Sequence, residues 1–377
     1  MSAWPGKYVI GLTGNIATGK SVVRRMLEHL GAYGIDADAL AHRAIAKGAP
    51  GYQPVLDLFG KWLLNEDQQI DRSKLARVVF ADDDALNLLE NIVHPLVRQA
   101  VDVLIRRSRY KVVVIEAIKL IEGSLNNKCD TLWVTYAPPE VQLVRLMGKR
   151  GMSEAVARQR ISSQPLQELK IGMANVVIRN DKSFEETWNQ VLAAWRHIFP
   201  VSEVESGLSV ETKAGKFNLL RARPGDAAEI ARFVSRITSS KRKLSAEDIM
   251  AAFGEKAYLL LKVDGNLLAV AGWQVENLVA RIDEIYLDPS LPMDKTLPAL
   301  MEHIEKGSQE LQCEAALLFL PPELAIRDTL WSNLGYQESS IHNLKVRAWQ
   351  EAAIESLPAG SIMRFKRLRA DLVLKPV

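Results

Sequence analysis

Residues 8–30 read YVIGLTGNIATGKSVVRRMLEHL, and this stretch decides the fold of the first half of the chain. It opens with a compact apolar run, Tyr8 to Leu12, of the kind found in buried strands. From Val22 to Leu30 the apolar residues recur at helical spacing. A turn rich in small residues separates the two segments. The stretch therefore predicts a strand, a glycine-containing turn and a helix in succession.

The turn matches the pattern G-x-x-x-x-G-K-[ST] over residues 14–21. In this context the backbone N–H groups of the turn and the start of the helix hold phosphate groups. Lys20 is predicted to reach the β- and γ-phosphates of ATP, and the Ser21 hydroxyl to bind Mg²⁺. The residues expected to bind the nucleotide are Gly14, Asn15, Ala17, Thr18, Gly19, Lys20, Ser21 and Val22.

The rest of the first half alternates strand-like and helix-like segments. Strands are expected at 8–12, 32–35, 111–116, 131–136 and 176–178, and helices at 19–30, 85–107, 138–149, 153–163 and 183–198. Such alternation predicts an α/β fold, a parallel sheet with helices on both faces. A polar segment at 201–216 contains two glycines and predicts a linker between domains at 1–200 and 217–377.

The second half has a different pattern, which predicts a mixed α/β domain with adjacent, antiparallel strands. The turn Asp264-Gly265-Asn266 is typical of a β-hairpin. Strands are expected at 218–221, 257–263, 267–273, 281–287 and 315–320, and helices from 226 onwards and at 295–311.

Composition narrows the class of protein. The net charge is only +3 over 377 residues, and the basic residues are spread along the chain, which argues against nucleic acid as a partner. No apolar run is long enough for a membrane helix, and no signal peptide is recognisable, so we expect a cytoplasmic protein. The two cysteines, Cys129 and Cys313, form neither a disulfide framework nor a metal cluster.

Several segments beyond the turn, in order over residues 8–198, resemble dephospho-CoA kinases. They are IDAD at 35–38, AH at 41–42, GAPG at 48–51, HPLVR at 94–98, EAIKLIE at 116–122, RQRISSQ at 158–164 and ANVVIRN at 174–180. The resemblance implies a P-loop kinase with a helical lid that transfers the γ-phosphate of ATP to the ribose 3′-hydroxyl of dephospho-CoA. At 118–120 the chain has Ile-Lys-Leu where the family has Pro-Leu-Leu.

The acidic residues predicted at this site follow strands. Asp36 comes directly after a predicted strand, at the carboxyl edge of the sheet beside the P-loop, and is our candidate to orient or deprotonate the acceptor hydroxyl. Asp38 is the alternative for this role, and either residue could instead cap the helix that follows. Glu116 ends another strand and is expected near the Mg²⁺ ion.

The resemblance also implies roles for basic and polar residues. Arg145 and Arg150 would close over the phosphates from the lid, where the fixed charge and forked donors of arginine suit the task. Asn180 would approach the adenine of ATP, and His94 and Arg98 would contact dephospho-CoA.

Residues 217–377 resemble the GNAT acetyltransferase fold, at NLLRARPGD (218–226), RIDEIYLDP (281–289) and LWSNLGY (330–336). The loop that holds the acetyl-CoA pyrophosphate in that family is rich in glycine, whereas residues 291–296 read LPMDKT. Pro292 lacks a backbone N–H and Asp294 adds negative charge, so we expect a degenerate domain that serves as an accessory, with CoA or acetyl-CoA as a possible ligand.

Three alternatives to a kinase with an accessory domain stay open. The chain could be a bifunctional kinase and N-acetyltransferase, a nucleotide kinase with another acceptor, or a nucleotide-binding protein without transfer activity. The oligomeric state does not follow from the sequence.

Overall fold

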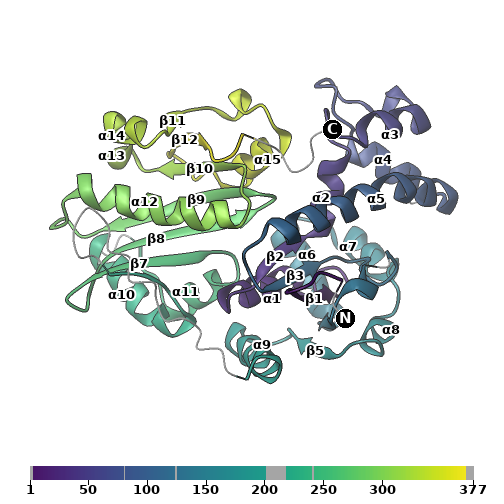
Figure 1. The fold of residues 1–377 in the computed structure, drawn as a ribbon, viewed down its shortest axis with the longest axis horizontal. Coiled ribbons are helices and arrows are strands. Elements are labelled where there is room, and N and C mark those ends of the chain that lie inside the picture. Colours follow the sequence, from purple (N-terminus) through teal and green to yellow (C-terminus); the bar gives the residue numbers. More distant parts are fainter. Residues whose placement is uncertain (1–2, 80, 124, 201–217, 240–241, 371–377) are drawn as a thin grey trace.

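The computed structural model describes residues 3–370 except 80, 124, 201–217 and 240–241, and it omits the side chains of residues 149 and 150. The expected linker at 201–216 therefore lies outside the described residues. The strands on either side of this gap form two separate sheets, seen at opposite sides of Figure 1.

The first sheet has five strands in the order β2-β3-β1-β4-β5, and every pairing is parallel. The strands are β1 (Tyr8–Thr13), β2 (Tyr33–Asp36), β3 (Val112–Glu116), β4 (Thr131–Tyr136) and β5 (Val176–Arg179). The helices are α1 (Lys20–His29), α2 (Ala37–Ala44), α3 (Tyr52–Phe59), α4 (Arg72–Val79), α5 (Asp83–Arg107), α6 (Pro139–Arg150), α7 (Glu154–Ser162), α8 (Gln167–Ile171) and α9 (Phe184–Ile198).

Side chains alternate between the two faces of this sheet, as the pleat requires. Val9 of β1 joins an apolar core formed with α2, α3 and α5, whereas its neighbour Ile10 joins a second core formed with α1 and α9. Helices therefore cover both faces, which confirms the predicted parallel α/β sheet. The strand ends Thr13, Asp36 and Glu116 meet at one edge because all the strands run in the same direction.

The second sheet has seven strands in the order β11-β12-β10-β9-β8-β7-β6. Its strands are β6 (Asn218–Arg221), β7 (Ala257–Val263), β8 (Asn266–Glu276), β9 (Val279–Leu287), β10 (Ala315–Leu320), β11 (Gln337–Glu338) and β12 (Ile362–Arg367). The helices are α10 (Ala227–Ile237), α11 (Ala246–Ala252), α12 (Met293–Glu310), α13 (Pro322–Ala325), α14 (Asp328–Asn333) and α15 (Arg347–Ser356).

The strand pairing of this sheet confirms the predicted mixed α/β domain. Strands β9 and β10 pair in parallel, and the other neighbours are antiparallel. The predicted hairpin is also present, because β7 and β8 pair on either side of a turn in which Asp264 and Gly265 have φ of 49° and 80°. Strand β12, which pairs with β10 along its whole length, was not predicted from the sequence.

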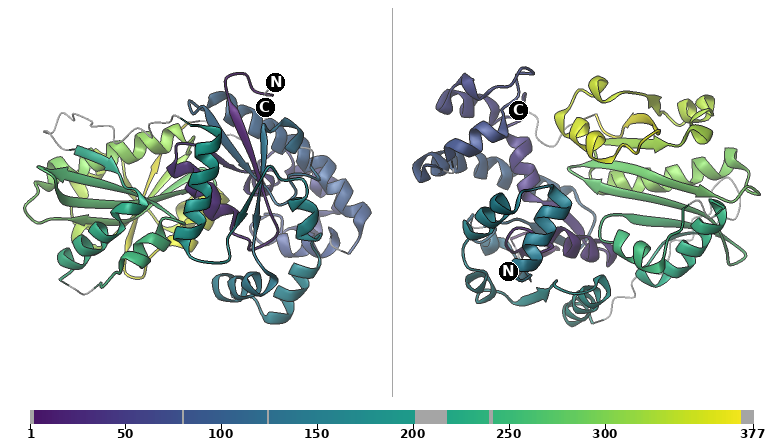
Figure 2. Two further views of the ribbon diagram at one scale, coloured as in Figure 1. Left: turned by 90° about the horizontal axis from the view of Figure 1, so that it is seen from below. Right: turned by 180° about the vertical axis from the view of Figure 1, so that it is seen from behind.

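Helix α1 lies between the two sheets, as both Figure 1 and Figure 2 show. It covers one face of the parallel sheet, and its far end contacts the second half of the chain, where His29 bonds to the carbonyl of Phe253. Among the described residues, no helix is long and apolar enough to cross a membrane.

Candidate active site

The P-loop runs from the end of β1 to the start of α1. Gly14 and Gly19 have φ of 149° and 93°, and a Cβ at either position would lie within 2.3 Å of another side chain. These two positions therefore require glycine. Ala17 also has a positive φ, of 58°, so this alanine adopts a backbone conformation that glycine adopts at lower cost.

Lys20 begins α1 and is almost fully buried, with 7% of its surface exposed. Its Nζ donates to the carbonyl of Asn15 at 3.1 Å, across the loop. Burial lowers the pKa of Lys20, and the charges of Glu116 and Asp38 oppose that shift. The Lys20 ammonium group therefore lies against the P-loop, and its contact with the β- and γ-phosphates stays a prediction. The side chain of Val22 instead packs against the apolar core under α1.

Ser21 of α1 and Glu116 of β3 are in direct contact. The Ser21 hydroxyl donates to Glu116 Oε1 at 2.8 Å, and Arg24 Nε donates to Glu116 Oε2 at 2.7 Å. In the described part of the chain, no cluster of three or more His, Cys, Asp or Glu side chains could hold a metal ion. A Mg²⁺ ion at this place would therefore rely on the Ser21 and Glu116 oxygens, phosphate oxygens and water, a donor set that Mg²⁺ accepts.

Asp36 is the last residue of β2 and the N-cap of α2, where its Oδ1 accepts from the Ala39 N–H at 2.8 Å. It lies beside Glu116, because the two residues are register partners on β2 and β3. Burial, and then the negative charge of Glu116, raise the pKa of Asp36 to about 7. The capping role and the site position, which the sequence posed as alternatives, are compatible in one side chain.

Asp38 lies in the first turn of α2, two residues after Asp36. Its Oδ2 accepts from the Ile118 N–H at 3.1 Å. Burial raises its pKa, against the hydrogen bond from Ile118 and the charge of Lys20. Of the two aspartates, Asp38 interacts more strongly with the Lys20 ammonium group.

The backbone of Ile118, the first residue of the Ile-Lys-Leu segment, takes part in the site through both its N–H and its carbonyl. The Ile118 N–H binds Asp38, and its carbonyl accepts from Thr13 Oγ1 at 3.0 Å and from Lys170 Nζ at 2.6 Å. These contacts use only the backbone of Ile118, but the bond to Asp38 requires an N–H, which a proline at this position would lack.

The sequence analysis missed Lys170. This lysine of α8 is 4% exposed, and its charge interacts with Lys20 and Asp38. Burial lowers its pKa, opposed by the charge of Glu122. It has no motif around it, and a lone lysine on a short helix would ordinarily be assigned to the surface. The buried Arg24, which binds Glu116, was also missed, because its place on an amphipathic helix is typical of a solvated face.

The lid contacts the P-loop through Arg145 of α6. Its guanidinium donates to the carbonyl of Ala17 at 3.1 Å and to that of Asn180 at 2.8 Å. Asn180 in turn donates to the carbonyl of Thr18 at 3.0 Å. Arg145 and Asn180 thus both meet the nucleotide loop. Arg150 ends α6, and its side chain lies outside what the structure describes.

His94 and Arg98 lie one turn apart on α5, the first half-buried and the second exposed. Within the described residues, neither side chain bonds to the P-loop or to the aspartates. The structure therefore does not gather them with the groups at the sheet edge.

Comparison with known proteins shows which family the first half of the chain resembles. A family model described as dephospho-CoA kinase matches residues 8–186. The dephospho-CoA kinase of Carboxydothermus hydrogenoformans is 43% identical over 187 residues, which are 49% of this chain and 91% of that protein. That of Aquifex aeolicus is 42% identical over 190 residues, 50% of this chain and 96% of its own length.

The chain belongs to the dephospho-CoA kinase family. The relatives match only its first half, so the second domain is an addition to the kinase domain that they share.

Solved structures resemble each half separately. Dephospho-CoA kinase from Campylobacter jejuni is 28% identical and covers 51% of this chain and 98% of its own, with a TM-score of 0.35. The ribosomal-protein-S18-alanine N-acetyltransferase of Escherichia coli is 17% identical and covers 41% of this chain and 96% of its own, with a TM-score of 0.33. The fold of the second domain is defined by its own strand order, β11-β12-β10-β9-β8-β7-β6.

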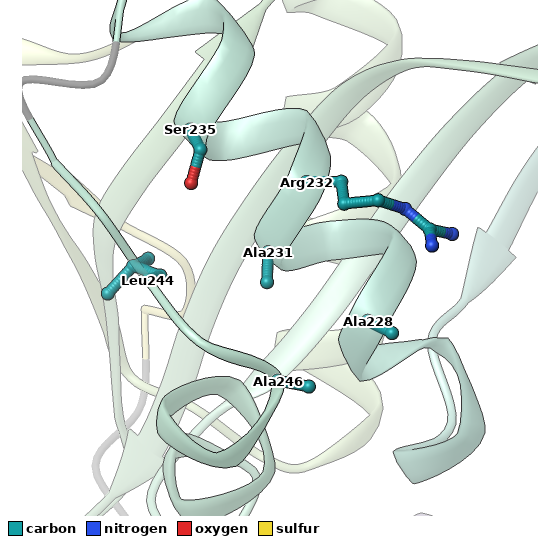
Figure 3. A pocket seen from close by; sticks show the side chains of 6 residues that line it. All are labelled: Ala228, Ala231, Arg232, Ser235, Leu244 and Ala246. Carbon is teal, nitrogen blue, oxygen red and sulfur yellow. The ribbon is translucent and has the colours of Figure 1, made fainter.

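In the second domain, the segment expected to hold a pyrophosphate, residues 291–296, forms the start of a helix. Helix α12 begins two residues earlier than expected, after Pro292, and the Lys295 and Thr296 N–H groups both bond to the Pro292 carbonyl. A hollow of about 380 Å³ between α10 and α11 is shown in Figure 3. It is lined by Ala228, Ala231, Arg232, Ser235, Leu244 and Ala246. Arg232 points away from Leu244 in that view, and the short lining side chains include no acid or general base.

Proposed function

We propose that this kinase transfers the γ-phosphoryl group of ATP to the ribose 3′-hydroxyl of dephospho-CoA, giving CoA and ADP. The observation that carries the proposal is the meeting of Asp36 and Asp38 with the buried Lys20 at one edge of the parallel sheet. Phosphoryl transfer needs an acceptor group held in line with the γ-phosphorus and positive charge around the transferred oxygens. Asp36 or Asp38 would hold the acceptor group, and Lys20 would supply the positive charge.

In the proposed reaction the bond between the γ-phosphorus and the bridging oxygen breaks, and a bond from the 3′-oxygen to phosphorus forms. Asp36 orients the hydroxyl and accepts its proton. Because its pKa is raised to about 7, Asp36 is a stronger base than an ordinary aspartate and is still largely ionised above neutral pH. Asp38 is the alternative base. Lys20 and Arg145 would stabilise the charge on the transferred group.

The residues at the site fit a Mg²⁺ ion. Ser21 and Glu116 would hold it, and the ion would neutralise charge on the β- and γ-phosphates. Arg24 keeps the Glu116 carboxylate turned toward Ser21 through the hydrogen bond described above.

The remaining assignments follow from the same proposal. Arg150 would join Arg145 on the phosphates, Asn180 would lie near the adenine, and His94 and Arg98 would contact dephospho-CoA from α5. The partners would be these small molecules, with no nucleic acid or membrane, in the cytoplasm.

For residues 217–377 we propose an accessory domain without acetyl transfer, joined to a kinase domain at 1–200 through the segment 201–216. Pro292 and Asp294 at the start of α12 support this, since neither favours a bound pyrophosphate. Titration of the full chain with CoA and acetyl-CoA measures whether the domain binds either ligand, and acetyl-CoA consumption with a panel of amines tests for transfer.

The deciding experiment is ADP release from the purified chain with MgATP, with and without dephospho-CoA, with CoA identified as the product. We expect a large increase that depends on dephospho-CoA. We expect Asp36→Asn to bind ATP as the wild type does and to lose most of the transfer. An increase with another nucleoside or nucleotide but not with dephospho-CoA would refute the proposed acceptor. Unchanged turnover in Asp36→Asn would move the base to Asp38.

A further inference from the structure

Two helices of the kinase domain begin at the active site and contact the second domain at their other ends. Helix α1 begins with Lys20 and Ser21 and ends with His29, which bonds to Phe253. Helix α2 follows Asp36, carries Asp38 in its first turn and ends with Arg43 and Ala44. The second domain thus contacts the far ends of the elements that hold the proposed catalytic groups.

Arg43 makes the strongest of these contacts. Its Nη1 donates to the Asn277 carbonyl at 2.7 Å, and its Nη2 lies 2.5 Å from Glu314 Oε2. The Glu314 side chain is fully buried and that of Arg43 is 10% exposed, so solvent screens this ion pair weakly. The Glu314 N–H also donates to the Leu278 carbonyl at 2.7 Å, which fixes the acceptors of Arg43 relative to each other.

The acceptors belong to the turn between β8 and β9. Asn277 and Leu278 have φ of 52° and 62°, a conformation that side chains other than glycine seldom adopt. Leu278 packs against the apolar core of the kinase domain. Two such residues between the paired strands β8 and β9 form the two-residue turn that β-hairpins favour, and this turn carries Leu278 to the kinase core.

The same turn lies across a small cavity from Asp36, the proposed base. The cavity, of about 40 Å³, is lined on the kinase side by Arg24, Asp36 and Arg43 among others, and on the other side by residues 275–278. Helix α1 is tied to this region as well, since Arg25 contacts the Val275 carbonyl at 3.5 Å. The second domain therefore binds the end of α2 and faces its start across this cavity.

We propose that Arg43 is a positioning residue for the kinase reaction, through which the turn at 277–278 and Glu314 hold α2 so that Asp36 and Asp38 face the P-loop. The inference rests on the proposed function for its catalytic readout. It makes the second domain a working part of the kinase site through its contacts with α2.

Arg43→Met tests this, with Arg72→Met as the matched control. Arg72 also joins the two domains, at 3.2 Å from Glu351, but it lies on α4. We expect Arg43→Met to lower kcat with dephospho-CoA about tenfold or more, because small displacements of catalytic groups have effects of this order. The Kd for a fluorescent ATP analogue should stay within about twofold, since α2 carries none of the P-loop. Arg43→Lys should restore part of kcat.

Arg72→Met should change kcat less than about twofold, because a half-exposed ion pair contributes little. Equal losses of kcat in the two arginine variants would overturn the proposal, since both would then report only the weakening of the interface. So would a wild-type kcat in Arg43→Met with ATP binding intact.

Hydrogen exchange of the amides of residues 37–44 gives a readout that needs no substrate. Arg43→Met should speed exchange across α2, and Arg72→Met should not. If the wild type shows no turnover with dephospho-CoA, the proposed acceptor fails while this measurement still tests the positioning of α2. Unchanged exchange in Arg43→Met would overturn the positioning role whatever the acceptor.

Discussion

Acidification should weaken the folded chain through one histidine at the contact between the domains. His29 Nε2 lies 3.0 Å from the Phe253 carbonyl. A carbonyl can only accept, so Nε2 carries the hydrogen and Nδ1 is bare. Nδ1 is buried and has no hydrogen-bond partner in the described part of the structure. A second proton would therefore place a charge where nothing accepts its hydrogen.

The magnitude follows from the pKa. Burial, and then the charges of Arg221 and Arg25, lower the pKa of His29 from 6.5 to about 3. Between these values the unfolded chain takes up a proton that the folded chain does not. Stability is thus full above pH 6.5 and falls as the pH drops. At pH 5 the loss is about 2 kcal/mol, from about 1.4 kcal/mol for each unit below the ordinary pKa.

Urea unfolding of the full chain at pH 7.5 and pH 5 measures this loss, with His29→Gln as the comparison. Glutamine keeps a donor for the Phe253 carbonyl and does not titrate, and all other titrating groups are common to both proteins. The wild type should lose about 2 kcal/mol more than the variant between the two pH values. A difference below about 0.5 kcal/mol would refute the assignment of a buried, neutral imidazole.

Two further pairs of substitutions, each with a control, have expected outcomes. Gly34→Ala should destabilise the chain by about 1–3 kcal/mol in urea unfolding, because a Cβ there would lie 1.9 Å from Glu28 Oε1. Gly307→Ala, in a helix with open space around it, should instead raise stability by up to about 1 kcal/mol. Lys170→Met should lower kcat/KM for dephospho-CoA at least about tenfold in steady-state assays, through the loss of a buried charged donor. Lys182→Met, which removes an exposed lysine, should leave it unchanged.

Local signals in the sequence were enough to predict the kinase fold. The strand, turn and helix around Lys20 depend on residues close together in the chain, and the predicted strand ends place Asp36 and Glu116 at one edge before any distance is known. The resemblance to the family then selected Arg145 and Asn180, and the structure brings both to the P-loop. These predictions needed no knowledge of how distant segments pack.

The contacts between the domains could not be predicted in this way. Arg24 and Arg25 lie on an amphipathic helix and have the pattern of a solvated face, yet they are only 4% and 8% exposed. Their burial depends on Glu116 and on the end of β8, which are far away in the sequence. Arg43 is similar, because the carboxylate that defines its role is 271 residues away.

That separation has a consequence for biosynthesis. At about 5–20 residues per second, a ribosome needs roughly 15 to 50 s to reach Glu314 after it has made Arg43. During this interval the kinase half can form its own sheet, but the end of α2 lacks its partners. The nascent chain thus passes through a stage in which the P-loop segment has been made, while α2 still lacks the contacts of Arg43 with the second domain.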